Sequence, residues 1–347
     1  MNNRQLTFAR EYRGYTQTEL SSMVKGLSQS NLSKFEKGLD TLSEDLLERI
    51  MGVLQFPMQF LKLNINTTVE GHYRKKATIK ASQRAQMERF VSIVAYMVDW
   101  MSEELEYPEF KFNYIDVEQG FSPAEIARIT RRQFKLGNLP IRDIFGLLES
   151  NGIIVYQWDC DIKEFDGVSV LTDKGHPLIV INKNMSNDRK RFTLAHELGH
   201  TIMHQSLDFI ISEHRDKEKE ANDFASEFLM PELAMRSYLC NLTLKSLQEN
   251  KRYWLTSMAS ILQSAKKTGI IEENRYKNLM IEMSRNGWRL KEPVMVSIDT
   301  TQSLDKAYEL FTESLSYRLE DISKAAMIPV DVIKKVFETK KVVYLKK

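Results

Sequence analysis

The sequence predicts a mostly helical α+β fold that contains more than one domain. Glycine and proline are scarce, at 14 and 8 of 347 residues, and apolar residues recur at helical spacing over most of the chain. The β part rests on three short β-branched segments between residues 152 and 182. Because 347 residues exceed what one core normally serves, we expect about two or three domains.

Composition and charge exclude several classes of protein without indicating a function. Apolar residues make up 42%, charged residues 28%, and the formal net charge is +2, which excludes a collagen, a coiled-coil rod and a wholly disordered chain. No apolar run reaches membrane-spanning length and the first residues lack a signal-peptide core, so we expect a cytoplasmic protein without a membrane partner. Cys160 and Cys240 have no CxxC spacing and are expected to be free thiols.

The first 65 residues are expected to form a small bundle with a helix-turn-helix arrangement. Thr16 and Glu19 have the spacing of a capping box, which predicts the start of a short helix that Gly26 ends. Ser28 is predicted to cap a second short helix, in which Leu32 and Phe35 face inward. Two short helices joined by a tight, glycine-containing turn are typical of helix-turn-helix units.

The outward face of the second helix carries amides, hydroxyls and a lysine, which can bond base edges and phosphates. The pattern TQxxL followed by GLSQSNLSKFEKG resembles the phage-repressor-like (XRE) helix-turn-helix family. The resemblance implies double-stranded operator DNA as a partner, bound by a homodimer, with these contact residues: Gln17, Gln29, Ser30, Asn31 and Lys34. It also implies a structural role for Glu36. A bundle that contacts protein instead stays open, because residues 1–65 hold eight basic and seven acidic residues.

The chain beyond residue 65 changes character several times. A basic run from Arg74 to Arg89 is followed by an apolar-periodic run from Phe90, which predicts an amphipathic helix with a basic start. A solvated helix face is the favoured interpretation of the basic run, and phosphate contact is the alternative. Helices are expected to Arg132 and from Ile141, followed by strands within 152–158, 165–171 and 176–182, and then by helices again. The predicted domains are 1–65, 66–293 and 294–347.

The most specific motif is RFTLAHELGHTIMH, residues 191–204. His196 and His200 lie four residues apart in an apolar-periodic segment, so a helix would place both imidazoles on one face, where they can bind one metal ion. Glu197, beside the first histidine, suits a general base that acts on water. His204 continues the series, but a fourth protein ligand would close the position that catalysis needs, so we expect it to support the site or to pack.

A third ligand is expected from a second amphipathic helix, residues 216–232. Glu218 and Glu220 lie at its start, and either could complete a set of two histidines and one glutamate. Helical phase favours Glu218, because it shares the face of Ala221 and Ala225. Two solvated acids near a helix N-terminus are the structural alternative.

HELGH followed by ExxANxFAxxxLMP resembles the ImmA/IrrE family of zinc metallopeptidases, over roughly residues 74–293. The resemblance implies a zincin-like domain with a small sheet, zinc held by His196, His200 and Glu218, and Glu197 as the base. It implies a zinc metalloendopeptidase (a peptide-bond hydrolase) of the gluzincin type whose substrate is a regulatory protein such as a repressor.

The sequence thus predicts a DNA-binding transcriptional regulator with a zinc metallopeptidase domain and a helical C-terminal extension used for packing or dimerisation. Two alternatives stay open. The zinc domain could be a sensor or ligand-binding module with little turnover, or the protein could be an antitoxin-like DNA-binding protein.

Overall fold

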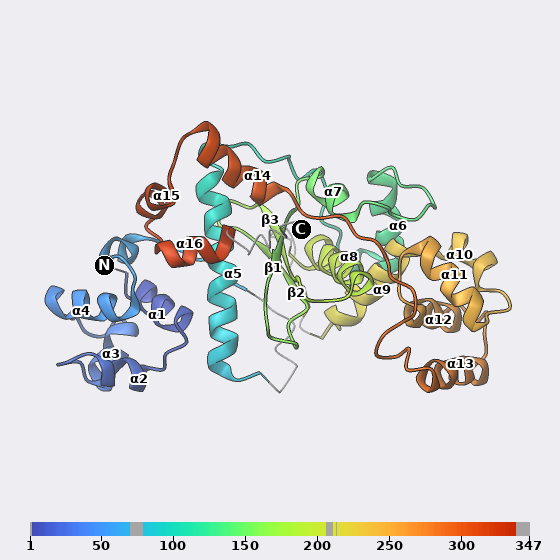
Figure 1. Ribbon diagram of the computed structural model, residues 1–347, viewed down its shortest axis with the longest axis horizontal. Coiled ribbons are helices and arrows are strands. Elements are labelled where there is room, and N and C mark those ends of the chain that lie inside the picture. Colours follow the sequence, from blue (N-terminus) through green and yellow to red (C-terminus); the bar gives the residue numbers. More distant parts are fainter. Residues whose placement is uncertain (1, 70–78, 206–210, 213, 338–347) are drawn as a thin grey trace, which may run out of the picture. The chain divides into compact units, whose positions relative to one another are not determined.

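The computed structural model describes residues 2–69, 79–205, 211–212 and 214–337 (Figure 1). The chain divides into two compact units, which are described separately. Unit 1 comprises residues 1–107, 170–176 and 303–347, and unit 2 comprises residues 108–169 and 177–302. Among the helices that the structure describes, none combines the length and the apolarity needed to cross a membrane. The predicted domain boundaries at residues 65 and 293 stay a prediction.

The prediction of a mostly helical α+β fold with one small sheet is confirmed. The three strands, in the spatial order β1-β3-β2, are β1 (Ile154–Trp158), β2 (Gly167–Leu171) and β3 (Pro177–Asn182). β1 and β3 pair in parallel, with Ile154 opposite Leu178 and Trp158 opposite Asn182. Every residue of β3 is buried, which explains why its sequence PLIVIN is apolar at all positions before Asn182.

Unit 1 begins with the predicted helix-turn-helix bundle. Its elements are α1 (Asn3–Tyr12), α2 (Gln17–Met23), α3 (Gln29–Glu36), α4 (Glu44–Leu54) and the 3₁₀ turn η1 (Met58–Lys62). The capping box of Thr16 and Glu19 is present, and Ser28 caps α3. Leu32 and Phe35 of α3 are buried, as the sequence pattern predicts. The local signals at the two helix starts therefore fix this turn.

The helix α5 (Ala81–Met101) is buried around most of its circumference, where the sequence pattern predicts a single apolar face. Its second half, FVSIVAYMVDWM, is apolar on almost all sides, and such a helix needs partners on several sides. The C-terminal helices supply one of them in unit 1: α14 (Ser303–Glu309), the π turn η4 (Leu310–Ser314), α15 (Leu319–Ala326) and α16 (Val330–Phe337). Residues 74–78 of the predicted basic run lie outside the described residues.

Contacts within unit 1 join the C-terminal helices to α5 and to α1 (Figure 1). The Tyr96 hydroxyl donates to the carbonyl of Ala326 at 3.0 Å, and Arg13 forms an ion pair with Asp331 at 2.6 Å. The ammonium of Lys335, on α16, lies over an aromatic ring on each of α1 and α5. The C-terminal segment therefore packs against the helix-turn-helix bundle, in agreement with the packing role expected for it.

Unit 2 contains β1, β3 and helices that carry the motif residues. These are η3 (Val117–Gln119), α6 (Pro123–Gln133), α7 (Ile144–Glu149), α8 (Asn187–His204), α9 (Lys217–Leu229), α10 (Glu232–Leu239), α11 (Leu244–Trp254), α12 (Met258–Lys267) and α13 (Glu273–Arg285). α8 and α9 lie side by side (Figure 1). A Cβ at Gly199 would lie 3.0 Å from the Phe224 ring, so the glycine of HELGH lets α9 approach α8 closely.

Candidate functional site

The helix α8 presents its side chains to the interior along most of its length. From Lys190 to His204, every residue is buried except Phe192 and His196, which are partly exposed. These two residues lie one turn apart, so they mark one solvent-accessible stripe of the helix. The stripe gives solvent access to the motif at His196.

Three ligand-type side chains meet where α8 faces α9. The ring nitrogens Nε2 of His196 and His200 lie 3.0 Å apart. The Glu218 carboxylate reaches both of them, at 3.7 Å from His196 Nε2 and 3.4 Å from His200 Nε2. In a tetrahedral zinc site with bonds of about 2.0–2.1 Å, ligand atoms are about 3.3 Å apart. Within the described residues these three side chains form a group that could hold a metal, and their spacing fits zinc.

Hydrogen bonds on the far side of each imidazole orient the two rings. His196 Nδ1 lies 3.1 Å from the Asn222 side-chain oxygen, and His200 Nδ1 lies 2.8 Å from His204 Nδ1. His204 Nε2 in turn lies 2.8 Å from Glu220. Because a carboxylate only accepts, we assign the proton of His204 to Nε2, which makes its Nδ1 the acceptor for His200. His196 and His200 then each carry a lone pair on Nε2, toward Glu218.

Glu220 is not the solvated acid that the structural alternative describes. Arg215 binds it through two hydrogen bonds, of 3.0 and 2.6 Å, and its side chain is 15% exposed. With His204 on its other side, Glu220 lies behind His200 and away from the three-residue group. The structure thus brings Glu218, and not Glu220, together with the two histidines; their role as ligands stays a prediction.

Burial sets the protonation state of both histidines. It lowers the pKa of His196 to about 4, with a further contribution from the neighbouring His200. It also lowers the pKa of His200 well below its ordinary value, again assisted by a neighbouring imidazole, that of His204. Both rings are therefore neutral near pH 7, and the neutral ring is the form that binds a metal.

Glu197 is held by two residues that the sequence analysis did not single out. The Ser169 hydroxyl donates to the Glu197 carboxylate at 2.9 Å, and the Gln205 amide donates to the Ser169 hydroxyl at 3.0 Å. Burial raises the pKa of Glu197 to about 8, and the Ser169 hydrogen bond opposes this shift. A nearby cation would favour the ionised carboxylate. No spacing in the sequence indicates Ser169, because β2 meets α8 only in the folded chain.

We expect His204→Ala to weaken zinc binding about 10- to 100-fold, because the His200 ring would lose the hydrogen bond that orients it. Competition with a zinc-chelating dye measures the affinity. His214→Ala is the matched control, since His214 is an exposed histidine that contributes no atom to the group. Equal affinities of the two variants would show that His204 only packs.

The predicted DNA-contact residues share one exposed region of the helix-turn-helix. Gln29, Ser30, Asn31 and Lys34 are exposed on α3, and Gln17 at the start of α2 is partly buried. The local fold therefore leaves the predicted reading face open to solvent.

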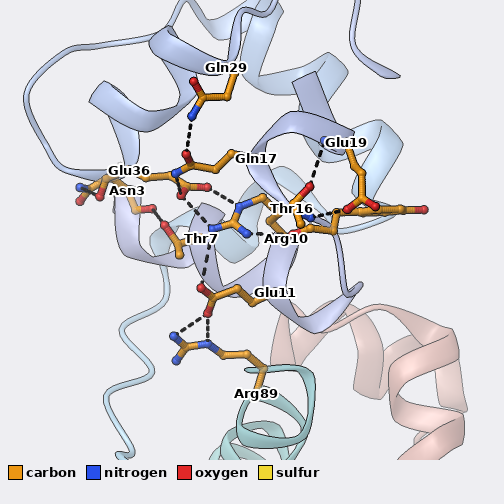
Figure 2. Close-up of polar contacts among 11 residues, drawn as sticks. Asn3, Thr7, Arg10, Glu11, Thr16, Gln17, Glu19, Gln29, Glu36 and Arg89 are labelled. Carbon is orange, nitrogen blue, oxygen red and sulfur yellow. Dashed lines mark hydrogen bonds and ion pairs between the residues drawn. The ribbon is translucent and has the colours of Figure 1, made fainter. Parts of the chain in front are cut away.

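A polar network lies beneath this face (Figure 2). The Gln29 amide donates to the Gln17 oxygen at 2.9 Å, and the Gln17 amide donates to Glu36 at 2.7 Å. Arg10 of α1 binds both carboxylate oxygens of Glu36, at 2.6 and 2.9 Å. Glu36 thus joins α1, α2 and α3, and it holds Gln17 against Gln29.

Comparisons with known proteins agree with both parts of this description. Residues 8–61 match a family described as helix-turn-helix, and residues 155–258 match a peptidase family described as IrrE N-terminal-like domain. Each family matches one part of the chain. The helix-turn-helix match covers α2 and α3, and the IrrE N-terminal-like match covers the sheet, α8 and α9 with all three residues of the candidate metal group.

One curated relative is similar to part of the chain. It is an uncharacterized immunity region protein 2 of Bacillus phage phi105, 38% identical over 72 residues. The similarity covers 19% of this chain and 46% of the relative, so the chain spans about half the length of that protein.

Proposed function

We propose that this protein is a DNA-binding transcriptional regulator whose IrrE N-terminal-like domain is a zinc-dependent endopeptidase that hydrolyses a regulatory protein such as a repressor. The observation that carries the proposal is the group of His196, His200 and Glu218, with the buried carboxylate of Glu197 one residue along the same helix. The helix-turn-helix match supports DNA as the second partner.

The proposed chemistry assigns a separate task to each side chain. His196, His200 and Glu218 would hold zinc, which when bound supplies the Lewis acidity that acidifies water and polarises a peptide carbonyl. Glu197 would take the proton of the attacking water and deliver it to the amine that leaves. His204 is engaged through both ring nitrogens, by His200 and Glu220, so three protein ligands remain, as in catalytic zinc sites.

The similarity to an immunity region protein of a phage favours a regulatory system of a mobile element as the setting. In such a setting the substrate would be a repressor that keeps the element silent. The direct test mixes the zinc-loaded protein with the repressor encoded nearest to it and detects fragments by mass spectrometry. Fragments that disappear with a zinc chelator support the proposal, whereas an intact repressor at equimolar enzyme would favour the sensor alternative.

We expect Gln29→Ala and Asn31→Ala each to weaken binding to the preferred operator by about 1–3 kcal/mol and to relax sequence preference, since each would remove a base contact. Lys34→Ala is expected to weaken all sequences alike and to reduce the slope of log affinity against log salt by about one, because one phosphate contact is lost. Fluorescence anisotropy with specific and scrambled duplexes at several salt concentrations measures both effects.

Two controls accompany this DNA-binding prediction. Lys62→Ala removes an exposed lysine outside α3 and is expected to bind like the wild type. Zinc chelation is also expected to leave DNA binding intact, because α2 and α3 belong to unit 1 and the candidate metal group to unit 2. Unchanged operator affinity in all three α3 variants would place DNA reading on another surface.

A further inference from the structure

A cavity of about 710 Å³ opens in unit 2 beside the first turns of α8. Its lining comes from the start of α8, from the start of α12 and from residues 288–296, here called the rim segment, which follow α13. This volume lies within the range of about 300–1,000 Å³ that ligand pockets occupy. The mechanism proposed above uses none of the rim segment.

Two sets of hydrogen bonds and ion pairs fasten the rim segment to the helices. The ammonium of Lys251, a residue only 2% exposed, binds Asp188 of α8 and Glu292 of the rim segment, each at 2.6 Å. Glu292 also accepts hydrogen bonds from the first backbone N–H groups of α12. The Asn187 amide donates to the carbonyl of Val296 at 2.8 Å. The cavity is therefore a preformed feature of unit 2.

The rim segment nevertheless exposes large apolar side chains. Leu290 is 97% exposed and Met295 is 88% exposed, and both line the cavity. Glu292 and Val296 anchor the backbone on either side of Met295, and the backbone N–H of Leu290 donates to the carbonyl of Gly287, so neither residue lies on a loose end. Exposed apolar residues at the mouth of a cavity are typical of an interaction site.

The unbalanced charge of the cavity is positive. Lys251 is paired with two carboxylates, which leaves one negative charge in excess at the start of α12, and Arg189 pairs with Asp166 at 2.6 Å. Arg289 and Lys291 are exposed at the rim, and no carboxylate within the described part of the chain forms an ion pair with either. The surface therefore complements an occupant that is both acidic and apolar.

The cavity continues into the solvent-accessible stripe of α8. Phe192 lines the cavity, and its ring centroid lies 6.4 Å from that of His196 in the candidate metal group. An extended peptide advances about 3.3 Å per residue, so about two residues cover this separation. A chain whose scissile bond lies at the metal group would thus reach the cavity within about three residues.

We propose that this cavity is a specificity subsite, which receives a large apolar side chain of the protein substrate about two or three residues from the scissile bond. Acidic residues beside that side chain would pair with Arg289 and Lys291. The inference rests on the proposed peptidase function and defines its substrate: an exposed, extended segment that combines acidic residues with one large apolar residue.

The test selects binders from a displayed library of random twelve-residue peptides, with the full-length, zinc-loaded Glu197→Gln protein as bait. Two double variants of the rim are compared in that background. The first carries Leu290→Ser and Met295→Ser, and the second carries Arg289→Glu and Lys291→Glu. The matched control is Ile281→Ser with Arg285→Glu, which makes the same kinds of change at exposed residues of α13 outside the cavity lining. Zinc content and circular dichroism verify that each variant is folded.

We expect selected peptides to combine Asp or Glu with a large apolar residue. Each rim variant should bind the synthetic consensus peptide at least about tenfold more weakly than the control variant, and the charge-reversed rim should select Lys or Arg instead. Failure to enrich any peptide, or equal affinity in rim and control variants, would overturn the subsite. If the consensus peptide binds through the rim but the wild type does not cut it, the peptidase function is contradicted. If the peptide is cut equally well with and without the rim substitutions, only the subsite is contradicted.

Discussion

Replacement of Glu197 by Gln is expected to lower the hydrolysis of the true substrate by about 10²–10⁴, the range for loss of a general base. The amide cannot take a proton from water, yet it has almost the shape of the carboxylate and can still accept the hydrogen bond from Ser169. Zinc content should not change, because Glu197 is not among the three ligand-type residues. Initial rates and bound zinc measured on the same preparation check both expectations.

The control for this comparison is Glu249→Gln, the same change at an exposed residue of α11. It is expected to keep the wild-type rate. Equal rates for Glu197→Gln and the wild type would show that Glu197 has no catalytic role, whereas absence of cleavage of any candidate by the wild type would favour a sensing module.

Single replacement of His196, His200 or Glu218 by Ala is expected to reduce zinc from about one per chain to almost none, since each change removes one of three protein ligands. Glu220→Ala is the matched control. Glu220 contacts His204 and Arg215 and not the ligand atoms, so this variant should retain zinc at micromolar protein with a lower affinity. Metal analysis by mass spectrometry measures the zinc content of each variant. Loss of zinc in Glu220→Ala with retention in Glu218→Ala would reverse the assignment of the third ligand.

The parts of the fold that depend on local signals could be predicted from the sequence. The Thr16 capping box and the Ser28 cap set the starts of α2 and α3, and both are found where the sequence places them. β1 lies within the predicted segment 152–158 because β-branched residues and the preceding Gly152 mark it locally. The burial of α5 on most sides could not be predicted in this way, since it depends on helices more than 200 residues later.

The candidate site, too, could be predicted where it depends on local spacing and not where it depends on tertiary contacts. Helical periodicity alone places His196 beside His200, and the phase of α9 favours Glu218 over Glu220. The support around them depends on tertiary contacts between elements: β2 supplies Ser169, and the segment before α9 supplies Arg215. No spacing in the sequence relates these residues to the motif.

The measurement that tests the central claim most directly is a comparison of new protein N-termini in cells. Cells that carry the wild-type protein and cells that carry Glu197→Gln are labelled at free amino termini under inducing conditions, and labelled peptides are identified by mass spectrometry. The account predicts at least one new terminus, inside a DNA-binding regulatory protein, that appears with the wild type and is absent with Glu197→Gln. Identical sets of termini in the two strains would contradict a proteolytic role for this protein.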